Sequence, residues 1–199
     1  MFELKFKRIT LAFDFSFFAV MSLMILLSDN KYIIMCFIVC LWHETGHLIM
    51  FLINDIKVRK ISFYGAGIKI TPEKSLDFTP FRTHLGVLIA GSALNFITFI
   101  LLENSDYSSF CVFAAINASI GAFNLLPLHF LDGGKILILI IRALCNYQRS
   151  VLLERFVKWI NIILIILVIL CFAFVGKGNI TLFATLCCLL FSAIMYNDV

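Results

Sequence analysis

Residues 32–53 read YIIMCFIVCLWHETGHLIMFLI, an apolar run with two histidines and one glutamate in its interior. An apolar stretch of about 20 residues is long enough to cross the hydrocarbon core of a bilayer as a helix. A charged side chain at the centre of a bilayer costs about 2.5–3.5 kcal/mol, so such residues usually serve a function. The segment therefore predicts a transmembrane helix that carries a functional site.

The composition of the whole chain is typical of a membrane protein. Of its 199 residues, 62% are hydrophobic and 14% are charged, whereas soluble domains average about 45–50% and about 25%. These values exclude a water-soluble globule and a disordered chain. The net charge of +4 is scattered without a basic tract, so we expect no nucleic-acid partner. The seven cysteines show neither zinc-finger nor disulfide spacing, and we interpret them as small apolar residues buried in the membrane.

The apolar runs predict an all-α polytopic membrane protein with about six transmembrane helices. The helices are expected at 11–28, 32–53, 84–102, 108–127, 157–175 and 180–195. Pro127 lies inside an apolar stretch at 108–145 that is too long for one straight span. Because proline removes a helix hydrogen bond and clashes with the preceding turn, the fourth segment is expected to break around 127–132.

The distribution of lysine and arginine predicts the orientation in the membrane. Basic residues gather before the first span, in the loop at 54–83 and before the fifth span. All three groups lie on one side if the N-terminus is cytoplasmic, as the positive-inside rule requires. We therefore expect a multi-pass protein of the cell membrane with both termini in the cytoplasm.

The loop after the second span has a pattern of its own. Apolar and polar residues alternate at 56–59, and a second short run follows Lys60 and meets a Gly65-Ala66-Gly67 turn. This pattern predicts a short β-hairpin over 56–70. The hairpin is either a plain surface feature or a strand edge offered to an extended peptide.

The sequence HETGH at 43–47 has the HExxH spacing of a metal site. His43 and His47 are four residues apart on a helix and share one face, so both imidazoles can reach one metal ion. Glu44 follows the first histidine, where its carboxylate can approach a metal-bound water as a general base. The motif predicts a hydrolytic zinc site within the membrane.

A hydrolytic zinc site needs a third protein ligand and an open position for water. The candidates in or near the spans are Asp14, His84, His129 and Asp132. The first two lie near span ends, where solvent contact explains them. Asp132 lies at the break after Pro127 and precedes two glycines that permit close backbone approach. A helix-capping role explains Asp132 equally well, and His129 remains a competitor.

Two motifs together resemble the site-2 protease family of intramembrane zinc metalloproteases (peptidase family M50). HETGH at 43–47 is followed by FNLLPLHFLDGG at 123–134, and GSALN at 91–95 is similar to a small-residue signature of the family. The order and spacing are most similar to the bacterial sporulation-type branch. The resemblance implies one intramembrane metalloprotease domain over 1–199, with neither a PDZ nor a nucleotide-sensing CBS domain.

The resemblance also implies roles for individual residues. His43, His47 and Asp132 would hold one catalytic Zn²⁺, and Glu44 would be the general base. Asn124 would lie near the scissile peptide or its oxyanion, and the hairpin at 56–70 would align an unwound substrate strand.

The chain departs from the family pattern at two positions. Phe130 stands where a second proline is frequent, and Ser92 stands where a proline is common. Neither change affects a predicted ligand, so both concern local backbone shape only.

The predicted function is therefore regulated proteolysis of membrane-tethered protein substrates, with regulatory membrane proteins as further partners. One alternative is a metal-ion transporter with the same ligands as a transit site. A transporter needs no general base, so Glu44 argues against it, as does the lack of an internal sequence repeat. The other alternative is a catalytically inactive scaffold, against which the complete set of four site residues argues.

Overall fold

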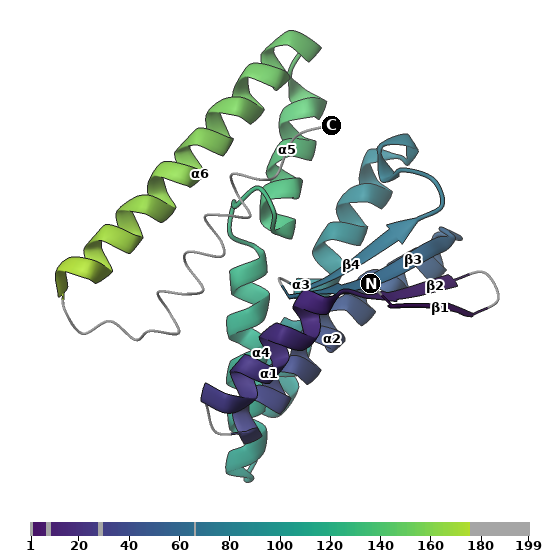
Figure 1. The fold of residues 1–199 in the computed structure, drawn as a ribbon. Helices are drawn as coiled ribbons and strands as arrows, with labels where there is room; N and C mark the ends of the chain where they lie inside the picture. The colour runs from purple at the N-terminus through teal and green to yellow at the C-terminus, as the bar shows by residue number, and fades with distance from the viewer. Residues whose placement is uncertain (1, 7–8, 28–29, 66, 176–199) are drawn as a thin grey trace. The chain divides into compact units, whose positions relative to one another are not determined.

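The computed structural model describes residues 2–6, 9–27, 30–65 and 67–175, which are mostly helical with one small sheet (Figure 1). The chain divides into two compact units, Met1–Asn124 and Leu125–Val199. The elements are β1 (Phe2–Phe6), β2 (Ile9–Phe13), α1 (Phe15–Leu27), α2 (Asn30–Ile53), β3 (Val58–Tyr64), β4 (Gly67–Pro72), a 3-10 turn (Leu76–Phe78), α3 (Phe81–Leu102), α4 (Ser108–Asn124), α5 (Asp132–Leu144) and α6 (Tyr147–Val175).

In the first unit, α3 packs against both α2 and α4. The crossing of α2 and α3 is close because small residues face each other there. A Cβ atom built on Gly46 of α2 would lie 2.5 Å from the Ala90 carbonyl oxygen and 2.9 Å from Gly91 Cα of α3. Trp42 Nε1 also donates a hydrogen bond to Thr98 Oγ1 at 2.8 Å. Small residues that let backbones approach are the usual way in which helices associate in lipid.

Two of the described helices are long and apolar enough to cross a membrane, as judged by length and composition: Tyr32–Ile53 in α2 and Phe81–Leu102, which is α3. They match the spans expected at 32–53 and 84–102. The shorter helix Ser108–Asn124 is also apolar. The span expected at 180–195 lies outside the described residues, so the count of six crossings stays a prediction.

The side chains of these helices are distributed as in a bilayer. Ser92, Asn95 and Asn117 are among the most deeply buried side chains, whereas Ile97 and Ile100 are exposed. In a lipid solvent, polar groups gather in the interior of a helix bundle and apolar groups face outward.

The sheet is larger than the hairpin that the sequence predicts. Its strand order is β1-β2-β3-β4, with β1 and β2 antiparallel, β2 and β3 parallel, and β3 and β4 antiparallel. The hairpin β3–β4 corresponds to the one expected at 56–70. The expected all-α fold and the first span at 11–28 need correction, because Ile9–Phe13 forms β2. Residues FELKF of β1 alternate between apolar and polar, which is a strand pattern.

The sheet is joined to the start of α1 by aromatic packing and hydrogen bonds. The rings of Phe13 and Phe63 stack with centroids 4.6 Å apart, and the Asp14 amide donates to the Phe63 carbonyl at 2.9 Å. Asp14 Oδ1 accepts a hydrogen bond from the Ser16 amide at 2.9 Å, as a helix cap does. This contact explains Asp14 without a metal. At the exposed side of the sheet, Lys60 donates to Glu3 and lowers the pKa of that carboxyl.

The second unit contains α5, α6 and the loop that precedes them. The helix break expected around Pro127 is present, since α4 ends at Asn124 and α5 begins at Asp132. Asn161 Nδ2 of α6 donates to the Pro127 carbonyl at 2.9 Å. Phe130 packs against Ile162 and Ile165 of the same helix. The loop is therefore held by α6.

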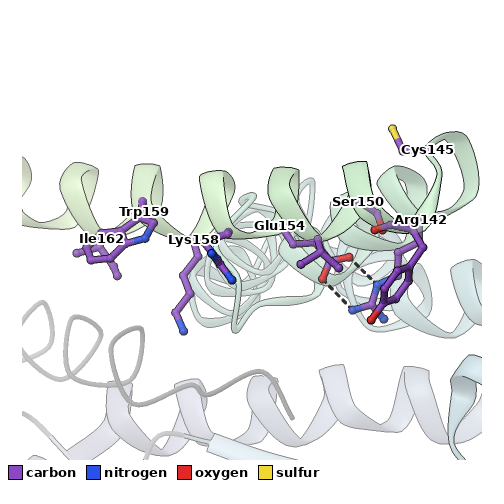
Figure 2. A pocket seen from close by; sticks show the side chains of 10 residues that line it. Arg142, Cys145, Ser150, Glu154, Lys158, Trp159 and Ile162 are labelled. Atoms are coloured by element: carbon purple, nitrogen blue, oxygen red, sulfur yellow. Dashed lines mark hydrogen bonds and ion pairs between the residues drawn. The ribbon is translucent and has the colours of Figure 1, made fainter.

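A paired arginine and glutamate join α5 to α6 beside a cavity of about 1260 Å³ (Figure 2). Arg142 Nε and Nη2 donate to Glu154 Oε1 and Oε2 at 2.7 and 2.9 Å. Trp159 and Lys158 also line this cavity. None of the site residues predicted from the sequence lies on its lining.

We expect Glu154→Gln to lower the free energy of unfolding by about 1–3 kcal/mol, because the charged pair with Arg142 is lost at a buried position. The measurement is unfolding in mixed micelles with a denaturing detergent. Arg149→Gln, at an exposed position of α6, is the control and should change the value by less than about 0.5 kcal/mol. Equal effects of both substitutions would contradict the assigned importance of the pair.

Candidate metal centre

The two histidines of α2 meet through their Nε2 atoms. His43 and His47 are 3% and 8% exposed, and their Nε2 atoms lie 3.2 Å apart. The rings are 4.9 Å apart and nearly perpendicular, at 80°. Two imidazole nitrogens bound to one tetrahedral Zn²⁺ at about 2.0–2.1 Å would be about 3.3 Å apart. The spacing of the pair fits a shared zinc ion.

Glu44 completes a cluster that could hold a metal ion. One ligand-type atom from each of His43, Glu44 and His47 lies within 4.8 Å of the others. The glutamate is half-buried, whereas both histidines are buried. Two imidazole nitrogens with an adjacent carboxylate are a donor set that zinc accepts.

Helix α3 forms the wall behind the histidines. His47 Nδ1 lies 2.7 Å from the Val87 carbonyl oxygen. Because a carbonyl oxygen can only accept, Nδ1 of His47 carries the proton, and the lone pair of the neutral ring is on Nε2. His43 Nδ1 lies 3.3 Å from Asn95 Nδ2. Both rings are thus oriented by contacts on the side away from the point where they meet.

Gly91 of α3 lies directly against that meeting point. A Cβ atom built there would be 2.6 Å from Nε2 of both His43 and His47. A real Cβ atom essentially never lies this close to another heavy atom. Any side chain at this position would therefore displace the two rings.

Asp132 is the first residue of α5 and belongs to the second unit. Its carboxylate is buried, with 6% of the residue exposed, and Oδ1 accepts a hydrogen bond from Lys135 Nζ at 3.1 Å. A Cβ atom on Gly133 or Gly134 would collide with carbonyl groups of the preceding loop. The two glycines therefore let the loop pack closely on the start of α5. The role of Asp132 as third ligand stays a prediction.

The remaining candidates belong to other elements of the chain. Asn124 is the last residue of α4, and its Nδ2 donates to the Ile120 carbonyl of the same helix at 3.0 Å. Its contact with a substrate stays a prediction. His84 lies half-buried near the start of α3, and His129 is buried in the loop before α5.

Three contacts of the site had no assigned role in the sequence. In the sequence, Gly91 and Asn95 appear only as parts of a small-residue signature. A glycine and an asparagine one turn apart in an apolar helix nevertheless indicate a face that packs closely against another helix. The contact of the Val87 carbonyl with His47 could not be predicted from the sequence, because every residue has a backbone carbonyl.

The chain is mostly helical, with two helices apolar enough to cross a membrane. One of these helices carries a histidine–glutamate cluster of the kind found in metallopeptidases. A family model described as Peptidase family M50 matches residues 101–171. The chain is 27% identical over 135 residues to Stage IV sporulation protein FB of Bacillus subtilis (strain 168), covering 65% of this chain and 46% of that protein. This chain therefore matches less than half the length of that relative.

The fold is also similar to a solved structure, the Site-2 Protease from Methanocaldococcus jannaschii. The TM-score is 0.73 with 26% sequence identity, covering 100% of this chain and 95% of that chain. Together, these matches show that the chain is similar to the site-2 protease family. The family consists of membrane-embedded zinc metalloproteases that cleave membrane-tethered substrates.

We expect Gly91→Ala to lower zinc affinity by at least about 10-fold, because its methyl group would displace both histidine rings. Competition with a chromophoric chelator measures the affinity. Gly86→Ala on the same helix is the control, since its Cβ would meet only the flexible end of Met50 at 2.8 Å. If the two variants bind zinc equally well, the assigned meeting point of the histidines is wrong.

Proposed function

We propose that the chain is an intramembrane zinc metalloendopeptidase that performs regulated proteolysis of membrane-tethered proteins. The observation that carries the proposal is the approach of His43 Nε2 and His47 Nε2 to 3.2 Å, with Glu44 in the same cluster. This arrangement lies in a helix apolar enough to cross a membrane. We further propose one catalytic domain with both termini in the cytoplasm.

His43, His47 and Asp132 would hold one Zn²⁺. When bound, zinc would make a water molecule nucleophilic near neutral pH and polarise the scissile carbonyl. Glu44 would accept the proton of the attacking water on its carboxylate and then donate it to the nitrogen of the leaving amine. Asn124 would hold the scissile peptide or its oxyanion through its amide group. The half-buried position of Glu44 supports a carboxylate that exchanges protons.

The substrate would be a membrane-tethered protein that unwinds locally, because helical hydrogen bonds shield its peptide bonds. Strand β4 is at one end of the strand order, so one of its edges is open to a further strand within the described sheet. An unwound substrate segment would pair with this edge through backbone hydrogen bonds. Regulatory membrane proteins would control this pairing of the substrate with β4.

Glu44→Gln tests the proposed function. Because Glu44 is proposed as base and not as ligand, the variant should keep near-stoichiometric zinc while cleavage falls by at least about 100-fold. Metal per chain and cleavage of a panel of single-span substrates are measured in liposomes, with wild type before and after chelation as the control.

The outcomes separate the protease from its alternatives. Loss of wild-type cleavage on chelation and its return with added zinc would support a zinc enzyme. Bound zinc in both proteins with no cleavage by either would favour a scaffold. A wild type that binds no zinc would contradict the proposal.

A photo-reactive residue in place of Lys69 tests substrate pairing with β4. In the Glu44→Gln background, we expect it to crosslink a single-span substrate, because this exposed position lies on the open edge strand. The same residue in place of Leu4, exposed on the opposite edge strand β1, is the control. Equal crosslinking at both edges would leave β4 as a plain surface strand.

A further inference from the structure

The carboxamide of Asn95 is buried against His43 and is only half satisfied. Asn95 is 0% exposed, and its Nδ2 lies 3.3 Å from His43 Nδ1. Its Oδ1 is buried and has no hydrogen-bond partner among the residues that the structure describes. A buried acceptor without a partner destabilises a fold, so this oxygen requires an explanation.

The tautomer that zinc requires supplies the explanation. Ligation through Nε2 of a neutral histidine leaves the proton on Nδ1. Nδ1–H of His43 would then face the NH₂ group of Asn95, which is also a donor. Rotation of the carboxamide by about 180° exchanges its oxygen and nitrogen with almost no change in shape. After this rotation Oδ1 accepts from Nδ1–H of His43, and the NH₂ group takes the place that Oδ1 leaves.

Helix α3 already provides a hydrogen-bond acceptor for Nδ1 of the second histidine, His47. His47 Nδ1 donates to the Val87 carbonyl oxygen at 2.7 Å. Val87, Gly91 and Asn95 follow one another at intervals of four residues, so they lie along one face of α3. On this face the Val87 carbonyl accepts from His47, Gly91 leaves space for both rings, and the carboxamide of Asn95 lies beside His43. The two histidines are themselves one turn apart on α2.

We propose that Asn95 is a positioning residue whose Oδ1 accepts a hydrogen bond from His43 Nδ1–H when His43 Nε2 holds zinc. The contact fixes the tautomer and the ring orientation of His43, as the Val87 carbonyl does for His47. The proposal rests on the proposed function of the same site. Removal of such partners of metal-ligating histidines typically costs about 10–100-fold in metal affinity.

The test compares zinc affinities of purified variants in detergent by competition with a chromophoric chelator. We expect Asn95→Leu and Asn95→Ala to bind zinc about 10–100-fold more weakly than wild type. Asn95→Asp should bind within about 3-fold of wild type or more tightly, because a carboxylate offers acceptors only. The alanine variant keeps the test valid if the leucine variant does not fold, as judged by helical content.

Asn117→Leu is the matched control. Asn117 is also 0% exposed, but its Nδ2 donates to the Phe113 carbonyl of its own helix at 2.9 Å. Its replacement should leave zinc affinity unchanged. A second measurement is ¹⁵N NMR of labelled histidines with bound zinc, in which Nδ1–H of His43 should exchange with water faster in Asn95→Ala than in wild type.

Each outcome decides the proposal. Rescue by aspartate together with loss in the leucine or alanine variants supports it. Equal loss in Asn95→Asp and Asn95→Ala, wild-type affinity in Asn95→Ala, or equal loss in Asn117→Leu overturns it while the proposed function stands. A wild type that binds no zinc overturns both.

Discussion

The close approach of α2 and α3 is the constraint on which the site depends. In lipid, helices gain no hydrophobic energy from each other that the acyl chains would not also supply, so they associate through tight packing and polar contacts. Gly46 brings the α2 backbone against Ala90, and Gly91 leaves the space in which the histidines meet. An α3 displaced outward by one methyl group would lose its contacts with both imidazoles. The packing of α2 against α3 therefore also sets the geometry of the candidate metal centre.

This packing also explains how a membrane helix carries two buried imidazoles. A polar group in hydrocarbon needs a partner, because no water is present to supply one. The Val87 carbonyl has two lone pairs, so it can accept from His47 in addition to serving its own helix. The backbone and one side chain of α3 thus provide what solvent would provide elsewhere, and the Nε2 atoms stay directed at a common point.

The sequence predicts those features that depend on spacing within one segment. The HETGH motif, the apolar runs that became α2 and α3, and the break after Asn124 follow from periodicity and from one proline. The strands at the N-terminus were missed because Glu3 and Lys5 in an alternating segment also resemble charges that flank a span. The contact of the Val87 carbonyl depends on the crossing of two helices, which no local pattern encodes. For Asp132, spacing indicates a candidate, whereas its ligand role depends on the placement of another unit.

The parallel pairing of β2 with β3 constrains how the protein is made. Thr10 pairs with Lys60, and both α1 and α2 lie between them in the chain. The ribosome therefore releases β2 well before β3 exists, so β2 can at first pair only with β1 while α1 and α2 are being made. Since the two strands end in one sheet, the chain must return to the side from which α1 departed. A β2 strand that paired elsewhere before β3 was made would leave α1 and α2 beside an incomplete sheet.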